Sequence, residues 1–293
     1  MKCETKSRKL FLAINGTLLI LLGVLCLVPI INAIAVSFSG AVAIGAGKVT
    51  LWPVDFQLDS YRYILSRSEF FDGLFVTLKR LVLGTVIQMV VTVFTAFPLS
   101  MEKRDFRFRT VYVWFFVFTM LFGGGLIPLY LQIRSLKLLD TIWALILPGA
   151  VSVYNIILML NFFRGVPREL SEAFYVDGAN YHHVLWQLYI PLSAPSFATI
   201  LLFTMVGHWN SWFEGLIYMN HPRNYPLATY LYTIVQTFDY SNISQESAEL
   251  LSRITTRSAK CAQIVVAMIP IVCVYPFLQR YFVKGIVLGS VKG

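Results

Sequence analysis

The sequence predicts an all-α membrane protein with six transmembrane helices. Of its 293 residues, 57% are hydrophobic and only 13% are charged, whereas soluble domains are usually about 45–50% apolar. Six runs without Asp, Glu, Lys or Arg are long enough, or nearly so, to cross the roughly 30 Å hydrocarbon core of a bilayer as helices. These runs should be helices rather than open strands, because unpaired backbone groups are too costly in lipid.

The spans form a single transmembrane domain over residues 1–293, and we place them at about 10–36, 75–101, 110–133, 141–163, 189–217 and 261–280. The basic segment Met1–Lys9 leads into the first span, so we expect a cytoplasmic N-terminus. A cleavable signal peptide is the alternative, since Asn32–Ala35 offers a cleavage site, but the apolar run exceeds the roughly 7–15 residues of a signal peptide. Six spans then place the C-terminus and the connections 102–109 and 164–188 in the cytoplasm.

Composition also excludes several functions. The net charge is +9, but the basic residues are spread over many connections, which favours a role in topology and contact with anionic lipid over nucleic-acid binding. The four cysteines and four histidines show no metal-ligand spacing, so we expect no metal site and no disulfide framework. Catalytic motifs are also missing, so we expect neither catalysis by this chain alone nor a bound cofactor.

The outer segment Phe38–Asp72 follows the first span, and we expect it to form an outer cap with a short helix at Tyr61–Leu65. Its Gly45–Val49 stretch looks like a phosphate loop but lacks the first glycine and the metal-binding Ser or Thr. Lys79 and Arg80 follow at the outer end of the second span. They either snorkel to the interface or face an aqueous path, where they would attract an anionic substrate.

The third span is interrupted by Phe122–Pro128, whose residues Gly124, Gly125 and Pro128 disfavour a continuous helix. Irregular backbone at membrane depth is tolerated only where it is buried in protein or lines a cavity. We therefore expect a candidate gate near the outer surface. Close helix packing through small residues is an equally good explanation.

The fifth span ends in a polar and aromatic cluster at Gly207–Gly215, which includes Trp209, Asn210, Trp212 and Glu214. Such side chains suit sugar rings, which present apolar faces and polar edges, so the cluster is a candidate part of a translocation path. An aromatic belt at the membrane interface explains the same residues equally well.

A long polar stretch separates the fourth and fifth spans. We expect short helices at 172–176 and 180–190, with Asp177-Gly178 as the turn between them. Pro191 and Pro195 close the stretch just before the next apolar run. This predicts a helix-turn-helix outside the lipid, and we name residues 164–190 the elbow.

The elbow resembles the cytoplasmic coupling loop of ABC importer permeases. The resemblance rests on Glu-Ala at 172–173, Asp-Gly-Ala at 177–179 and the two prolines at 191 and 195. It implies the type I importer permease architecture and an ATPase contact made by Glu172, Ala173, Asp177, Gly178 and Ala179. Phe174 replaces the family's usual second alanine, which should change local packing but not the turn. An ordinary amphipathic cytoplasmic loop is the alternative.

Three further stretches resemble the sugar-importing branch of these permeases: Leu129–Asp140, Trp209–Phe213 and the ending Tyr281–Gly293. In that branch the tail approaches the ATPase pair, which implies contacts by Lys284, Gly285 and Gly289. Three glycines in this apolar tail favour an extended segment over a free helix. The outer connection Asn220–Lys260, with a helix expected at 227–235, would reach towards a solute-binding protein.

The resemblance implies a permease subunit of an ATP-driven importer in a bacterial cytoplasmic (inner) membrane. The chain is similar to the second permease of maltose-type and alginate importers, which implies an oligosaccharide substrate, either neutral or acidic like alginate. Its partners would be a different permease, two ATPase subunits that bind ATP and Mg, and a periplasmic or extracellular solute-binding protein. A secondary transporter that uses Glu214 for ion coupling is the alternative.

Overall fold

The computed structural model describes residues 6–236 and 255–289. Within these residues the chain is mostly helical, and its β structure is a single bridge between Ser39 and Phe56. Contacts divide the chain into two compact units. Unit 1 holds residues 1–68 and 233–269, and unit 2 holds residues 69–232 and 270–293.

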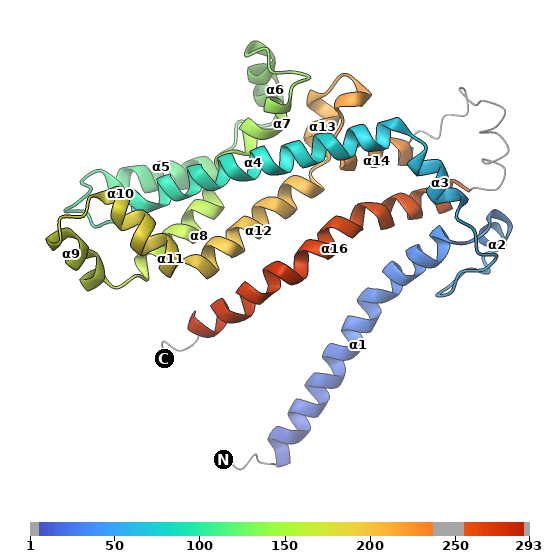
Figure 1. Ribbon diagram of the computed structural model, residues 1–293, viewed down its shortest axis with the longest axis horizontal. Helices are drawn as coiled ribbons and strands as arrows, with labels where there is room; N and C mark the ends of the chain where they lie inside the picture. The colour runs from blue at the N-terminus through green and yellow to red at the C-terminus, as the bar shows by residue number, and fades with distance from the viewer. Residues whose placement is uncertain (1–5, 237–254, 290–293) are drawn as a thin grey trace. The chain divides into compact units, whose positions relative to one another are not determined.

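Unit 1 contains α1 (Lys6–Ser37), α2 (Ala41–Gly45), α3 (Asp59–Leu65) and the first part of α16 (Thr256–Gly289) (Figure 1). The end of α1 packs on α2 through a small core that includes Val36 and Ile44. Phe38 stacks on Phe56 and Tyr61, which folds the outer segment back on itself. The expected short helix before Leu65 is confirmed and begins at Asp59.

The helices of unit 2 follow one another along the chain, from α4, which starts at the boundary residue Ser68, to α14, which runs past Tyr232. Their bounds are α4 (Ser68–Ser100), α5 (Arg109–Leu121), α6 (Leu126–Ser135), α7 (Ile142–Ile146), η1 (Leu147–Gly149), α8 (Val153–Arg164), α9 (Arg168–Val176), α10 (Tyr181–Val184), the π-helical turn η2 (Leu185–Tyr189), α11 (Ile190–Leu192), α12 (Ala194–Asn210), α13 (Phe213–Tyr218), η3 (Pro222–Asn224) and α14 (Leu227–Gln236).

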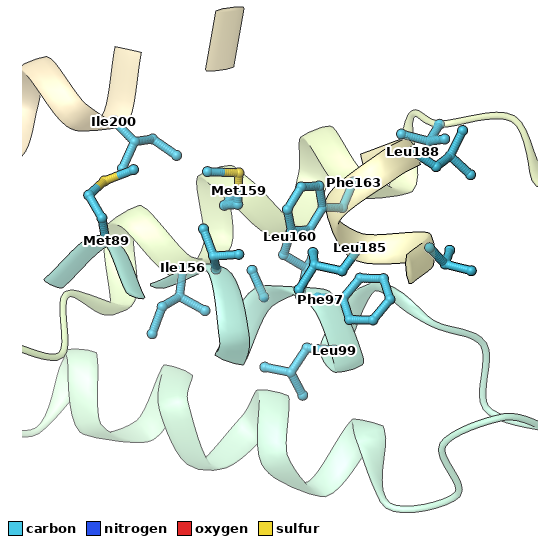
Figure 2. Packing of buried hydrophobic residues seen from close by; sticks show 14 residues of the cluster. Met89, Phe97, Leu99, Ile156, Met159, Leu160, Phe163, Leu185, Leu188 and Ile200 are labelled. Carbon is cyan, nitrogen blue, oxygen red and sulfur yellow. The ribbon is translucent and has the colours of Figure 1, made fainter. Parts of the chain in front are cut away.

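The main core of unit 2 joins the elbow to three long helices. Figure 2 shows Phe97 of α4 and Phe163 of α8 beside Leu185 and Leu188 of the elbow, with Ile200 of α12 in the same cluster. All five side chains are at most 6% exposed. The second arm of the elbow is therefore fixed to the helical body by buried apolar contacts, which are the main source of packing stability.

Among the described residues, two helices are long and apolar enough to cross a membrane, namely residues 10–37 of α1 and all of α4. Three further pairs of helices qualify if each bent pair is one span: α5 with α6, bent by 109°; α7 and η1 with α8, bent by 48°; and the helices of 181–192 with α12, bent by 83°. Two to five spans are thus supported, and six spans remain a prediction.

Two boundaries differ from the sequence prediction. The fifth span does not begin at residue 189 and end at 217: α12 covers only Ala194–Asn210, because the chain bends at Ser193 and is extended at Ser211. The part of the tail that the structure describes, residues 281–289, is also not extended, since it lies in the helical backbone of α16. The helix continues because each added residue gains a backbone hydrogen bond without a new nucleation cost. A single glycine lowers helix stability by only about 1 kcal/mol, so Gly285 does not interrupt α16.

Candidate functional site

The turn of the elbow is a complete helix C-cap. Gly178 has φ +81°, a left-handed conformation that favours glycine. Its N–H donates to the carbonyl of Tyr175 at 3.1 Å, and the N–H of Ala179 donates to that of Phe174 at 2.9 Å. These two bonds define a Schellman motif. Next, Asn180 Oδ1 accepts from the backbone N–H of His183 at 3.0 Å and begins α10. The backbone thus runs from α9 through a turn at Gly178 into α10, and its role as a coupling loop stays a prediction.

The tip of the elbow faces outward. Glu172, Ala173, Asp177 and Gly178 are exposed, as a contact surface requires. Val176 stands between them with 87% of its surface exposed, and sequence reasoning missed it. An apolar residue directly before the polar turn Asp177-Gly178 is the sequence signal that could have marked Val176 as a contact residue.

Two of the residues expected in this region point inward. Ala179 and Phe174 pack against the main core of unit 2 and are partly buried. The ring of Phe174, which replaces the family's usual alanine, therefore packs on the buried side of the turn and stabilises it. The expected closing prolines also lie at helix starts, Pro191 in α11 and Pro195 in the first turn of α12.

Ion pairs tie the first arm of the elbow to the connection between α4 and α5. Arg104 Nη2 lies 3.5 Å from Glu172 Oε1, and Arg168 pairs with Glu102. Sequence reasoning missed both pairs. Arg168 and Glu172 lie four residues apart and therefore on one face of α9. Their charges are opposite to those of Glu102 and Arg104, and this complementary pattern is the sequence signal that could have predicted the two pairs.

Beside these pairs lies a cavity of about 610 Å³ between the connection and the elbow. Tyr175 and Tyr181 contribute to its lining, with ring centroids 5.6 Å apart. Desolvation, followed by the neighbouring Tyr181, raises the pKa of Tyr175 to about 12. Its hydroxyl is therefore a hydrogen-bond donor at neutral pH.

Arg80 does not snorkel to an interface, so that expectation is wrong for this residue. It is 4% exposed, and its Nη2 lies 3.7 Å from Glu214 Oε2. Its guanidinium also donates to Ser211, to the carbonyl at 3.3 Å and to Oγ at 3.0 Å. The hydroxyl of Ser211 in turn donates to Glu214. A buried arginine needs such a partner, because an isolated charge is very costly away from water.

Lys79 is separated from its neighbour Arg80, because adjacent helical residues point about 100° apart. It is exposed and lines a cavity of about 560 Å³ together with Asp72, Trp143 and Arg223. Arg223 Nε lies 3.8 Å from Asp72 Oδ2. The cavity thus holds a lysine, an aromatic face and mixed charges.

The aromatic cluster expected at the end of the fifth span does not gather into one surface. Trp209 is 8% exposed and belongs to the core, whereas Asn210 is exposed. Trp212 stacks on Tyr232, with ring centroids 4.1 Å apart. Only Glu214, through its pair with Arg80, is held in a polar network.

The expected break in the third span is confirmed at residues 122–125, where Gly125 has φ +86°. Gly124, Gly125 and Pro128 are all exposed in this chain. The tail residues Lys284, Gly285 and Gly289 lie in the helical backbone of α16. Contacts of either group with a partner stay predictions.

Asp140 is a further residue that sequence reasoning did not single out as a site. Its carboxylate accepts hydrogen bonds from the backbone N–H groups of Asn220 at 3.0 Å and His221 at 3.3 Å. Desolvation alone would raise the pKa of Asp140, but hydrogen bonds from Asn224, Asn220 and His221, with the charge of His221, outweigh it and lower the pKa. Asp140 thereby joins the connection between α6 and α7 to the connection after α13.

Comparison with known proteins gives the family. Residues 70–288 match the family described as "Binding-protein-dependent transport system inner membrane component". The polygalacturonan/rhamnogalacturonan transport system permease protein YtcP of Bacillus subtilis is 39% identical, over 98% of this chain and 100% of that protein. The arabinooligosaccharides transport system permease protein AraQ of Halalkalibacterium halodurans is 25% identical, over 90% of this chain and 91% of that protein.

A solved structure with the same fold supports the same family. One chain in the crystal structure of a bacterial ABC transporter involved in the import of the acidic polysaccharide alginate matches with a TM-score of 0.85 and 32% identity. The match covers 96% of this chain and 100% of that chain. This protein therefore belongs to the family of inner membrane components of binding-protein-dependent transport systems.

Proposed function

We propose that this chain is a permease subunit of an ATP-driven oligosaccharide importer, and that its elbow passes the motion of a partner ATPase to the transmembrane helices. The carrying observation is that the elbow has an exposed tip at Gly178 and a buried second arm at Leu185 and Leu188. An exposed tip can contact a partner, and a buried arm transmits displacement because packed cores deform little.

The proposed route of coupling has two branches. One runs from Leu185 and Leu188 into α4 and α8 through the main core. The other runs from α9 through the Arg104–Glu172 and Arg168–Glu102 pairs into the connection between α4 and α5. Movement of the elbow would thereby reach several helices together, which is the rigid-body motion that alternating access needs.

The proposed assembly contains a second, different permease, two ATPase subunits that bind ATP and Mg, and an extracytoplasmic solute-binding protein. We place it in a bacterial cytoplasmic membrane, with six spans and both termini in the cytoplasm. The exposed apolar surface of α1 and the exposed break before Gly125 would then face lipid or the partner permease. In this assembly the tail around Lys284, Gly285 and Gly289 would approach the ATPase pair.

We propose an acidic oligosaccharide as substrate. Two similar proteins support this: the solved transporter imports the acidic polysaccharide alginate, and YtcP is named for polygalacturonan and rhamnogalacturonan transport. Lys79 in the 560 Å³ cavity beside Trp143 is the residue of this chain that suits such a ligand. Arg80 is not, because its guanidinium is 4% exposed and its two terminal nitrogens already contact Glu214 and Ser211.

The alternative of a secondary transporter depends on a free carboxylate at Glu214. The pair with Arg80 gives this carboxylate a structural partner instead. Uptake that persists after loss of the ATPase partners would nevertheless favour the alternative over the importer.

Co-purification tests the proposed function. The chain is tagged, extracted gently from its native host, and its partners are identified by mass spectrometry. We expect an ATPase and a second permease, both reduced when Gly178 is replaced by valine or Glu172 by alanine. A Lys137→Ala variant, altered in the connection between α6 and α7, is the control and should keep both partners. Recovery of the chain alone, or only as a homo-oligomer, would contradict the proposal.

A further inference from the structure

The 610 Å³ cavity between the elbow and the connection before α5 has an excess of arginine. Four arginines contribute to its lining, together with three acids, Glu102, Asp105 and Glu172. All three acids pair with Arg104, and Glu102 also pairs with Arg168. The other two arginines, Arg109 and Arg164, have no carboxylate partner in the part of the chain that the structure describes.

Among the described residues, the guanidinium of Arg109 has a hydrogen-bond partner for one nitrogen but not for its buried Nε. Its Nη1 donates to the carbonyl of Met101 at 3.0 Å. Its Nε is buried and has no hydrogen-bond partner among the described residues. A buried donor without an acceptor is unfavourable, so this nitrogen indicates a missing oxygen ligand.

Arg164 lies close enough to Arg109 for the two charges to repel each other. Desolvation, followed by the charge of Arg109, lowers the pKa of Arg164 below its ordinary value. Arg109 is the first residue of α5 and Arg164 the last residue of α8, and these two helices pack together (Figure 1). The packing of these helix ends therefore brings two positive charges together, and a bound anion would reduce the repulsion between them.

The remaining donors of the cavity favour a tetrahedral oxyanion. Tyr175 and Tyr181 line the same cavity and can donate hydroxyl hydrogen bonds. Two guanidinium groups with neighbouring hydroxyls match the several acceptor oxygens of a phosphate, which arginine binds with its planar fork.

We propose that Arg109 and Arg164 form a binding site for a phosphate group in this cavity. The phosphate has two possible sources, the headgroup of an anionic phospholipid and free phosphate. The lipid source agrees with exposed apolar side chains close in sequence to the two arginines, Phe108 and Tyr112 at the start of α5 and Phe162 at the end of α8, which acyl chains could contact. The lipid source, but not the phosphate chemistry, depends on the proposed cytoplasmic side.

Two measurements on the full-length chain separate these sources. First, the chain is placed in nanodiscs of phosphatidylcholine with a minor share of phosphatidylglycerol, and the lipid retained after detergent washing is quantified by mass spectrometry. Second, thermal unfolding in detergent is compared in inorganic phosphate and in chloride at equal ionic strength. Retained phosphatidylglycerol identifies the lipid source, and stabilisation by inorganic phosphate alone identifies the free ion.

The main variant is Arg164→Gln, because Arg164 is exposed and lines the cavity, so its replacement should leave the fold intact. We expect it to weaken binding of the retained ligand about tenfold or more, the effect of losing one charged hydrogen bond. Arg109→Gln should act in the same direction. Arg107→Gln is the matched control, since Arg107 is exposed in the same connection but does not line the cavity.

Two results would overturn the proposal. One is that neither phosphatidylglycerol nor inorganic phosphate distinguishes the wild-type chain from Arg164→Gln. The other is that Arg107→Gln reduces binding as much as Arg164→Gln, which would indicate general attraction to the basic surface. Neither result depends on partner proteins, so failure of this proposal differs from failure of the proposed coupling role.

Discussion

Arg104 Nη2 lies 3.5 Å from Glu172 Oε1, and this ion pair joins the first arm of the elbow to the connection that leads into α5. Both side chains are largely exposed, at 70% and 61%. Exposed pairs of this kind contribute less than about 1 kcal/mol to stability. If the elbow moves as proposed, the pair would act by linking it to the connection between α4 and α5 rather than by adding stability.

A charge swap tests this role. Arg104→Glu alone places like charges opposite each other and should lower the substrate transported per ATP in the reconstituted importer. Adding Glu172→Arg restores an opposite pair and should recover part of that coupling, while the melting temperature changes little in all variants. If Glu172 acts only by contacting the ATPase, the double variant will be no better than either single variant.

Gly178 should tolerate few side chains. The space around it is open, since a Cβ would meet no atom within 4 Å, but its φ of +81° costs other residues about 1–2 kcal/mol. We expect Gly178→Val to uncouple ATP hydrolysis from uptake, with the membrane domain still folded by gel filtration. Gly178→Asn is the matched control and should retain more coupling, because asparagine accepts left-handed backbone. Normal coupled uptake by the valine variant would count against the assigned role.

The elbow could be predicted from sequence because its determinants are local. Asp177-Gly178 is a turn signal between short helices, and the Schellman bonds at Ala179 and Gly178 follow from it. The Arg80–Glu214 pair could not be predicted, since nothing in either stretch specifies that α4 and α13 meet. Tertiary packing also places Trp209 in the core, although Asn210 and Trp212 of the same stretch are exposed.

The network around Arg80 should show strong non-additivity. Glu214→Gln leaves a buried guanidinium without its acid and should destabilise the protein by about 2 kcal/mol, less than a fully buried pair because Glu214 is 39% exposed. The double variant Arg80→Gln with Glu214→Gln should be more stable than Glu214→Gln alone. Thermal unfolding of the purified chain measures both. If the losses measured for Arg80→Gln and Glu214→Gln alone simply add in the double variant, the two residues are not coupled.

Asp140 should make stability depend on pH in one direction. Its pKa is lowered in the folded protein, so the ionised carboxylate stabilises the fold above the ordinary value of 3.8, and this contribution is lost as pH falls from there towards the folded pKa. Asp140→Asn should therefore be less stable than the wild type at neutral pH. The difference should shrink below about pH 4. A difference that stays constant over this range, measured by thermal unfolding, would exclude the ionised carboxylate as its cause.

The absence of a side chain at Gly84 should be required for the ring of His208 to pack against α4. A Cβ on Gly84 would meet ring atoms of His208 at 2.7 Å, closer than real contacts allow. His208 is itself 7% exposed and has little room to move. Gly84→Ala should therefore lower the melting temperature, since overpacking typically costs about 1–3 kcal/mol. Gly207→Ala is the control, because its Cβ would meet nothing within 4 Å and alanine favours helix. It should leave the melting temperature unchanged or raise it, and an equal loss in both variants would show that helix packing at Gly84 is not the cause.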